Sequence, residues 1–180
     1  KDAKEALGVK GNRTLEGIII RSIDYGEANR IIGLFTQEVG KVTAFASGAR
    51  KSTKRFGGSL DLFAHVRAEV SPSRRSSTGM FRLLSVELVE MHFGLRHKLS
   101  CLATAGYRAD CLWNFTGEGD PHPKLFDWWK HVLKDLSEDK ATSADFQRLA
   151  PRLDLELLAY CGYAPRWSSC IQCGELPKGN

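Results

Sequence analysis

Hydrophobic side chains change their spacing halfway along this chain, and that change limits the folds it can adopt. In the first half, five short runs are rich in β-branched residues or alternate apolar with polar side chains, as strands do, and no long helical pattern separates them. From Gly94 onward, apolar residues recur with helical spacing. This order predicts an α+β protein with its strands and helices in separate halves. The strand-like runs are 15–26, 29–40, 41–49, 62–71 and 81–91.

The five predicted strands are short enough to close into a small barrel. The turn Glu38-Val39-Gly40 is so tight that the second and third strands should form an antiparallel hairpin. We predict an N-terminal five-stranded OB-fold barrel over residues 15–92, preceded by a tail at 1–14. An SH3-like barrel is the main structural alternative. OB-folds use one strand face and the loops at its rim to bind oligonucleotides and oligosaccharides.

The second half of the chain predicts an all-helical domain over residues 93–167. Three or four helices are indicated, with breaks at "GEGDPHP" and "SEDKATS". Pro151 either starts a new helix or kinks an existing one, and Gly162 is a suitable stop. A partial zinc-knuckle segment with a Cys-x-x-Cys sequence follows at 168–180.

Positive charge is concentrated in the first half of the chain. The net charge is +5, yet eleven basic and eleven acidic residues follow Glu90, so the whole excess precedes it. The window from Lys41 to Leu60 holds five basic residues and no acid. Such a field attracts polyanions such as nucleic acid or anionic lipid headgroups. The chain shows neither a secretory signal nor an apolar run long enough to span a bilayer, so we expect a cytoplasmic protein.

The centre of this basic window is the stretch "SGARKSTKRFGG", between the third and fourth predicted strands. An ordinary solvated loop is the usual interpretation of such a stretch. Its position on a small barrel favours a second one, in which its cations contact phosphates of DNA. The candidate DNA-binding residues are Arg50, Lys51, Lys54 and Arg55 in the loop, with Arg30, Lys41, Arg67, Arg74 and Arg75 extending the track.

Two aromatic residues near the loop are candidates for base stacking. Phe45 and Phe56 would each offer a ring to an unpaired base. Both could instead belong to the barrel core, and for Phe45 the core is slightly favoured.

Cys170 and Cys173 form a Cys-x-x-Cys knuckle followed by Gly174, which is half of a zinc site. Zinc needs four ligands, so we expect the remaining two beyond Asn180 or in residues not represented here. Two free thiols are the simplest alternative, and a redox pair is a further one.

The sequence offers no convincing catalytic motif. It has no G-x-x-x-x-G-K-[ST] loop for nucleotides, and its five histidines form no close-spaced cluster. We therefore expect a binding protein rather than an enzyme. A metal-dependent enzyme built on the two cysteines, and a scaffold whose barrel binds acidic partner tails, are the alternatives.

The order of three motifs is similar to that of a known family. The first is "LEGIIIRSIDYGEANRIIGLFTQEVGKVTAFASGARKSTKRFGGSLDLF", the second "FRLLSVELVEMHFGLRHKLSCLATAGYRADCL" and the third "LELLAYCGYAPRWSSCIQCG". Together they span most of residues 15–174. In this order they resemble the RecO family of bacterial DNA repair and recombination mediators.

The resemblance implies both a fold and a role. It implies an OB-fold, a helical domain and a zinc module. The implied role is to bind single- and double-stranded DNA, anneal complementary strands and help load RecA onto DNA coated by single-stranded-DNA-binding protein (SSB). RecR and the acidic, apolar SSB tail are the implied partners, in the cytoplasm at the nucleoid. If the tail binds the helical domain, apolar grooves beside Arg96, Lys98 and Arg108 would hold it; the simpler alternative is that these are solvent-exposed helix charges. Members of the family often have a second Cys-x-x-Cys, although some have lost the zinc cysteines. The family usually continues with more helix, so we expect a truncated or incompletely represented chain.

Overall fold

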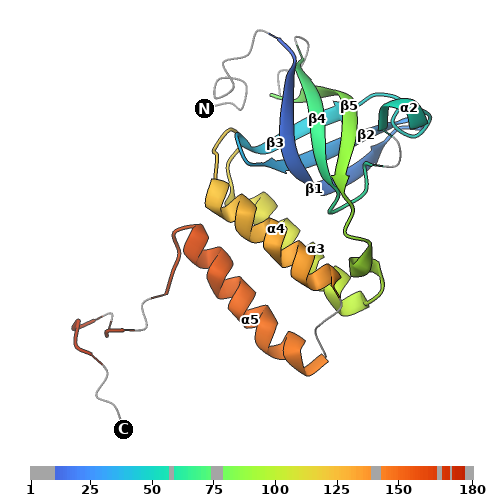
Figure 1. Ribbon diagram of the computed structural model, residues 1–180. Coiled ribbons are helices and arrows are strands. Elements are labelled where there is room, and N and C mark those ends of the chain that lie inside the picture. Colours follow the sequence, from blue (N-terminus) through green and yellow to red (C-terminus); the bar gives the residue numbers. More distant parts are fainter. Residues whose placement is uncertain are drawn as a thin grey trace. The chain divides into compact units, whose positions relative to one another are not determined.

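The computed structural model divides the chain into two compact units, Lys1–Ala141 and Thr142–Asn180, which are treated separately below (Figure 1). The residues whose structure is described are 11–56, 59–73, 79–138, 143–165, 168–170 and 172–176. The strands all belong to the first unit, and the helices are divided between the two.

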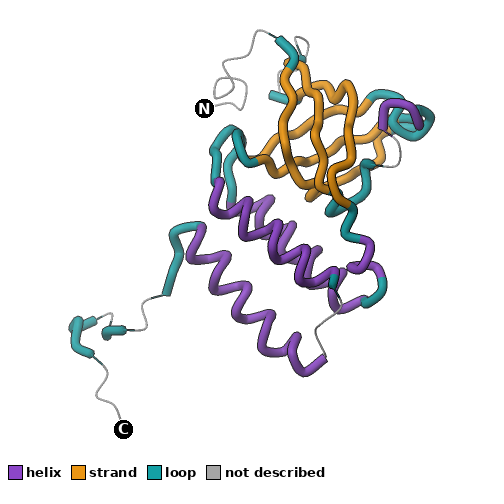
Figure 2. The backbone as a smooth tube through the Cα atoms, in the orientation of Figure 1, coloured by secondary structure: helices purple, strands orange, loops and turns teal. Residues whose placement is uncertain are grey.

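The first half of the chain forms a closed barrel of five strands, drawn in orange in Figure 2. The order around the barrel is β1-β2-β3-β5-β4, with β1 pairing β4 to close it. All strand pairs are antiparallel except β3 with β5. This arrangement is consistent with the predicted OB-fold. The strands are β1 (Arg13–Tyr25), β2 (Asn29–Thr36), β3 (Gly40–Ala46), β4 (His65–Pro72) and β5 (Phe81–Glu90).

Alternation along the strands sends one set of side chains into the barrel and the other outward. Along β3, Val42, Ala44 and Ala46 are buried in the core while Lys41, Thr43 and Phe45 face out and are half-buried. The predicted hairpin of β2 and β3 is confirmed, with Arg30 opposite Ala46 and Thr36 opposite Gly40. Along β1 a bulge near Ile20 shifts the register, so that Arg21 and Ile23 point outward beyond it.

Three helical segments of the first unit follow the barrel and pack on its outside: η1 (Phe93–Arg96), α3 (Leu99–Phe115) and α4 (Pro123–Ser137). The ring of Phe126 in α4 lies 6.2 Å from that of Phe35 in β2, and Trp129 lies 6.3 Å from Phe63. The barrel, α3 and α4 therefore form one compact unit across the predicted domain boundary at residue 92.

His65 is buried beneath α4, with its ring 6.1 Å from that of Phe126. Its Nε2 lies 2.8 Å from a carboxylate oxygen of Glu16. Burial is the main influence on this ring and lowers the pKa of His65, although Glu16 acts in the opposite direction. Burial therefore favours the neutral form of the His65 imidazole, which packs between the barrel and α4.

The described residues of the second unit comprise helix α5 (Ser143–Tyr160) and part of the segment with the two cysteines. The helix continues through Pro151, so of the two alternatives for this proline the start of a new helix is wrong. It ends near the predicted stop, where Gly162 adopts a positive φ of 85°. Among the described residues, no helix is both long enough and apolar enough to cross a membrane.

Candidate nucleic-acid interface

The basic loop, defined here as residues 47–55, is held against the turn that joins β1 to β2. The backbone N–H of Gly48 donates to Oδ1 of Asn29 at 2.9 Å, and that of Arg50 donates to the carbonyl of Ala28 at 3.1 Å. The N–H groups of Lys51 and Ser52 both bond the carbonyl of Gly48. Gly48 has a φ of +67°, which glycine adopts without strain. The loop therefore presents its cations from a fixed backbone.

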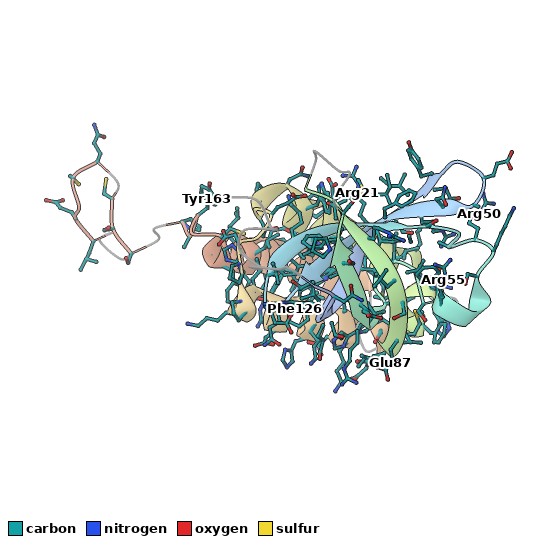
Figure 3. The ribbon with its side chains drawn as sticks, turned by 90° about the horizontal axis from the view of Figure 1, so that it is seen from above. Arg21, Arg50, Arg55, Glu87, Phe126 and Tyr163 are labelled. Carbon is teal, nitrogen blue, oxygen red and sulfur yellow. The ribbon has the colours of Figure 1, made fainter. Side chains whose placement is uncertain are left out.

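Arg50 and Lys51 are exposed on this loop, and Arg50 and Arg55 lie together at the end of the barrel away from Phe126 (Figure 3). The guanidinium of Arg55 donates to the Ser47 carbonyl at 2.8 Å and to Ser52 Oγ at 3.1 Å, so it also braces the loop. Three of the four predicted loop cations are thus grouped and accessible. The side chain of Lys54 lies outside the described residues, as do Arg74 and Arg75.

Phe56 ends the short helix α2 (Thr53–Phe56) and points into the barrel core, with 2% of its surface exposed. Its predicted role in base stacking is therefore wrong, because the ring has no accessible face. Burial of Phe56 instead anchors the C-terminal end of the basic loop. Phe45 shows the opposite outcome: it lies on the outward face of β3 rather than in the core.

Asp24 is an acid that the sequence interpretation did not include among the site residues. Its carboxylate accepts from Nε of Arg30 at 2.9 Å and lies 4.0 Å from a guanidinium nitrogen of Arg50. All three side chains are partly exposed. Asp24 therefore neutralises part of the predicted basic track, and a phosphate must compete with it. The pairing of Asp24 with Arg30 follows from the register of β1 and β2.

Lys41 is engaged at the junction between the barrel and α3. Its ammonium donates to the carbonyl of Trp113 at 2.7 Å and lies 4.8 Å from the centre of the indole ring. Desolvation lowers the pKa of Lys41. The guanidinium of Arg21 lies 5.0 Å from the centre of the same indole ring. Lys41 is a weaker candidate for phosphate contact than the loop cations, whereas exposed Arg21 is one that the sequence interpretation missed.

Arg67 lies on β4 among carboxylates rather than beside the basic loop. Its guanidinium is 4.0 Å from Glu16 and 3.7 Å from Glu87, on the two neighbouring strands. Figure 3 shows Glu87 on β5, apart from Arg50 and Arg55. The structure therefore does not bring Arg67 together with the loop cations.

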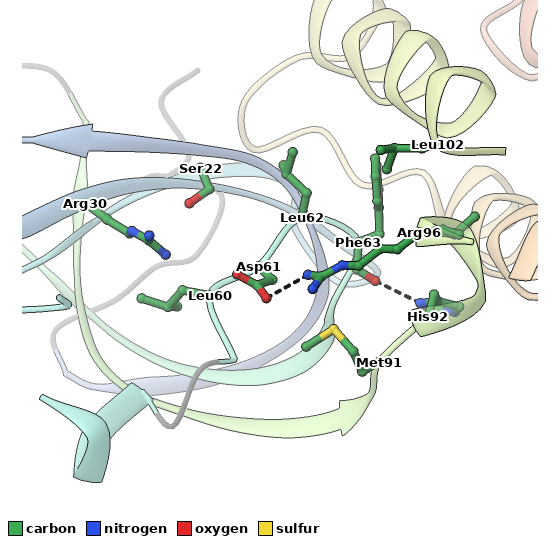
Figure 4. A pocket seen from close by; sticks show the side chains of 11 residues that line it. Ser22, Arg30, Leu60, Asp61, Leu62, Phe63, Met91, His92, Arg96 and Leu102 are labelled. Atoms are coloured by element: carbon green, nitrogen blue, oxygen red, sulfur yellow. Dashed lines mark hydrogen bonds and ion pairs between the residues drawn. The ribbon is translucent and has the colours of Figure 1, made fainter. Parts of the chain in front are cut away.

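A pocket of about 360 Å³ opens at one end of the barrel and brings together Arg30 and Arg96 (Figure 4). Arg96 donates to Asp61 at 2.7 Å on its rim. Phe63 lines the pocket and has a positive φ of 69°, which is an unusual backbone conformation for an aromatic residue. Its carbonyl oxygen accepts a hydrogen bond from Nδ1–H of His92 at 2.8 Å. The other residues lining the pocket are mainly apolar: Ser22, Leu60, Leu62, Met91, Leu95 and Leu102.

The three predicted partner-binding residues occupy different environments. Arg96 is exposed at the pocket, and Lys98 is half-buried at the start of α3. Arg108 has only 2% of its surface exposed, and its guanidinium donates to the carbonyl of Thr104 at 3.1 Å. The alternative that all three are solvent-exposed helix charges is therefore wrong for Arg108.

Cys170 and Cys173 form a compact turn in the second unit. The N–H of Gly174 donates to the carbonyl of Cys170 at 2.8 Å, and Gly174 has a φ of +76°. A backbone hydrogen bond from Cys173 lowers the pKa of the Cys170 thiol, which favours the thiolate that metals bind. The described residues contain no group of three or more His, Cys, Asp or Glu side chains that could together bind a metal ion. Two thiols are thus half of the donor set that structural zinc requires.

Comparisons with known proteins were consistent along the chain. Residues 12–92 match the family described as "Recombination protein O N terminal", and residues 96–180 match "Recombination protein O C terminal". A DNA repair protein RecO from Myxococcus xanthus is 35% identical over 162 residues, covering 90% of this chain and 64% of the relative. One from Anaeromyxobacter dehalogenans is 38% identical over 160 residues, covering 89% and 61%. The chain thus spans less than two-thirds of the length of these curated relatives.

Proposed function

Because the chain belongs to the RecO family, we propose that it is a DNA repair and recombination mediator that binds single- and double-stranded DNA and anneals complementary strands. It would act in the cytoplasm at the nucleoid and without catalytic turnover. The observation that carries the proposal beyond the family is the basic loop, whose exposed cations stand on a backbone fixed to the barrel. Such a rim loop is where OB-folds hold oligonucleotides.

Phosphate contacts would supply most of the affinity. Each neutralised phosphate releases condensed counterions, so binding is independent of sequence and weakens with salt. If about five phosphates are neutralised on a single strand, log K should fall against log salt with a slope of roughly −3 to −4. Annealing follows from the same charges, because cations that neutralise two strands reduce the repulsion between them.

The test compares two sets of charge removals. Alanine at Arg50, Lys51 and Arg55 should weaken oligonucleotide binding and flatten the salt slope by about 2 units, since each phosphate contact contributes about 0.7. Strand annealing, measured with and without SSB, should slow in parallel. Unchanged affinity together with an unchanged slope would remove the loop from the interface.

The matched control removes the same charge from α4. Its cations Lys124, Lys130 and Lys134 lie on the helix rather than on the barrel rim. Alanine at these three positions should leave the slope close to that of the unmodified protein. An equal loss in both variants would mean that net charge, and not the loop, determines binding.

The proposal includes RecR and the SSB tail as direct partners and RecA as the recombinase that is loaded. A second candidate function is a scaffold that binds acidic partner tails, with DNA secondary. The pocket favours it, because its walls are apolar and an acidic side chain can replace Asp61 beside Arg96 and Asp24 beside Arg30. Titrating an SSB-tail peptide against an oligonucleotide separates the two functions. Arg96→Ala should weaken binding of the peptide but not binding of the oligonucleotide. If the affinity for the peptide did not change in this variant, the pocket would not be its binding site.

We also propose that Cys170 and Cys173 provide two ligands of a structural zinc ion. The turn geometry and the lowered pKa of the Cys170 thiol support this role. Metal analysis of the purified protein tests it, with Cys111→Ser as a control thiol outside the turn. Purified protein with almost no bound metal would favour two free thiols.

A further inference from the structure

The outward face of β1, β2 and β3 carries an apolar patch that the phosphate contacts do not use. We define the outer patch as Ile23, Tyr25, Ile31 and Phe45. Ile23 pairs with Ile31 across β1 and β2, and Ile31 pairs with Phe45 across β2 and β3, which places these three side chains in one row. Tyr25 is 57% exposed and Ile23 is 43% exposed. Large apolar side chains that gather on one strand face in this way mark an interaction surface.

The two aromatic rings of the patch hold each other in a defined position. The centres of the Tyr25 and Phe45 rings lie 5.9 Å apart, with an angle of 81° between their planes. This edge-to-face contact fixes the rings without stacking them face to face. Because Tyr25 is more than half exposed, a planar group can be added to the pair.

Cations border the outer patch on two sides. Phe45 is in register with exposed Arg82 on β5, and Arg21 precedes Ile23 on the outward face of β1. At the other end, the basic loop begins directly after β3 and is bonded to the turn that follows Tyr25. A ligand that covers the patch therefore meets positive charge at both ends. A strand with unpaired bases has the complementary chemistry, with planar apolar rings along a chain of phosphates.

We propose that the outer patch stacks the bases of single-stranded DNA while the basic loop holds its phosphates. This inference rests on the proposed function, and it distinguishes the two DNA forms. A duplex keeps its bases stacked inside, so it can meet the cations but not the rings. The patch then contributes to single strands only, with little dependence on base identity. During annealing, a newly formed duplex loses these stacking contacts, which favours its release.

The test uses oligonucleotides that differ only in their bases. The unmodified protein should bind a normal single strand more tightly than an abasic strand of the same length, which keeps every phosphate. Tyr25→Ala should weaken binding to the normal strand at least about fivefold, and leave the abasic strand and the duplex within about twofold. The salt slope should not change, because no phosphate contact is lost.

Three further variants separate a binding role from a structural one. Tyr25→Phe retains the ring and should restore the affinity, whereas Phe45→Leu retains apolar packing but removes a ring and should weaken only the normal strand. Tyr107→Ala removes a tyrosine of 58% exposure from α3 and should change nothing. Thermal unfolding of each variant establishes that it is folded.

Several outcomes would overturn the inference. An unmodified protein that binds normal and abasic strands equally, but still binds DNA, refutes stacking and leaves the proposed function intact. Equal losses for single strand, duplex and abasic strand in Tyr25→Ala refute it as well. If Tyr25→Ala instead lost binding to anionic lipid vesicles and retained that to single strands, the patch would belong to a membrane surface. If the protein bound no DNA at all, the proposed function itself would be refuted.

Discussion

Neutralising Asp24 should tighten DNA binding, which is the reverse of the usual result of changing a residue inside a binding site. Asp24 pairs with Arg30 at 2.9 Å and lies 4.0 Å from Arg50. Asp24→Asn keeps the shape of the side chain and a hydrogen-bond acceptor. It releases both cations for phosphate and removes a negative charge from the path of the strand.

The size of the effect follows from the exposure of these groups. A partly exposed ion pair is worth about 0.2–1 kcal/mol, and that is the competition a phosphate must overcome. A carboxylate roughly 6 Å from a bound phosphate repels it by about 0.7 kcal/mol in water, before screening by salt. Together these give about 1 kcal/mol, or about fivefold tighter binding. Each phosphate newly contacted would also steepen the salt slope by about 0.7.

Fluorescence anisotropy of a labelled single strand over a range of salt concentrations measures both quantities. Glu38→Gln is the matched control, since it removes the same charge from an exposed residue in the turn at the opposite end of the β2–β3 hairpin. The gain should be confined to Asp24→Asn and should shrink as salt rises. Weaker binding by Asp24→Asn, or the same gain in both variants, would falsify the idea that Asp24 masks the loop.

Three further predictions concern stability. Burial lowers the pKa of His65, so the free energy of unfolding should fall as the pH is lowered from about 6.5 towards the folded-state pKa. In urea titrations, His65→Gln should reduce this loss of stability. The exposed control His97→Gln should not reduce it. Phe56→Ala should cost about 3–5 kcal/mol in the same assay, and a loss below about 1 kcal/mol would contradict its place in the core. Gly40→Ala should lower the melting temperature, because Gly40 has a φ of +73° and a Cβ there would overlap the Asp120 carbonyl. An unchanged melting temperature would show that this turn tolerates a side chain.

The barrel could be predicted because its strands carry local signals. Alternation along 41–49, the tight turn before it and Pro72 at the end of the fourth strand each specify backbone conformation without distant contacts. The basic loop was found for the same reason, since its four cations are adjacent in sequence. The sequence did not decide whether a helix would continue through Pro151 or begin there, because the cost of a proline within a helix depends on what surrounds it.

The remaining site residues depend on contacts between segments far apart in the chain. Lys41 meets Trp113 across 72 positions, and no sequence window contains both. Arg67 lies between two carboxylates only because β4 has β1 and β5 as neighbours. In the sequence, Phe56 follows loop residues and is therefore interpreted as an accessible aromatic residue. In the structure it ends the short helix α2 and is buried. Asp24 could have been found, because a hairpin closed by the turn after Tyr25 places it opposite Arg30.

The contact between Trp113 and Gly33 bears on how this barrel can be inherited. A Cβ at Gly33 would overlap the indole, so the outer face of β2 has no side chain at that point and the Trp113 ring from α3 lies against the strand. A fragment ending at residue 92 would lose this contact and the cover that Phe126 gives Phe35. Two aromatic rings from the helices thus cover parts of the barrel surface that the barrel's own residues leave uncovered. In another protein, the same barrel would leave Gly33 and Phe35 exposed unless a new neighbour covered them.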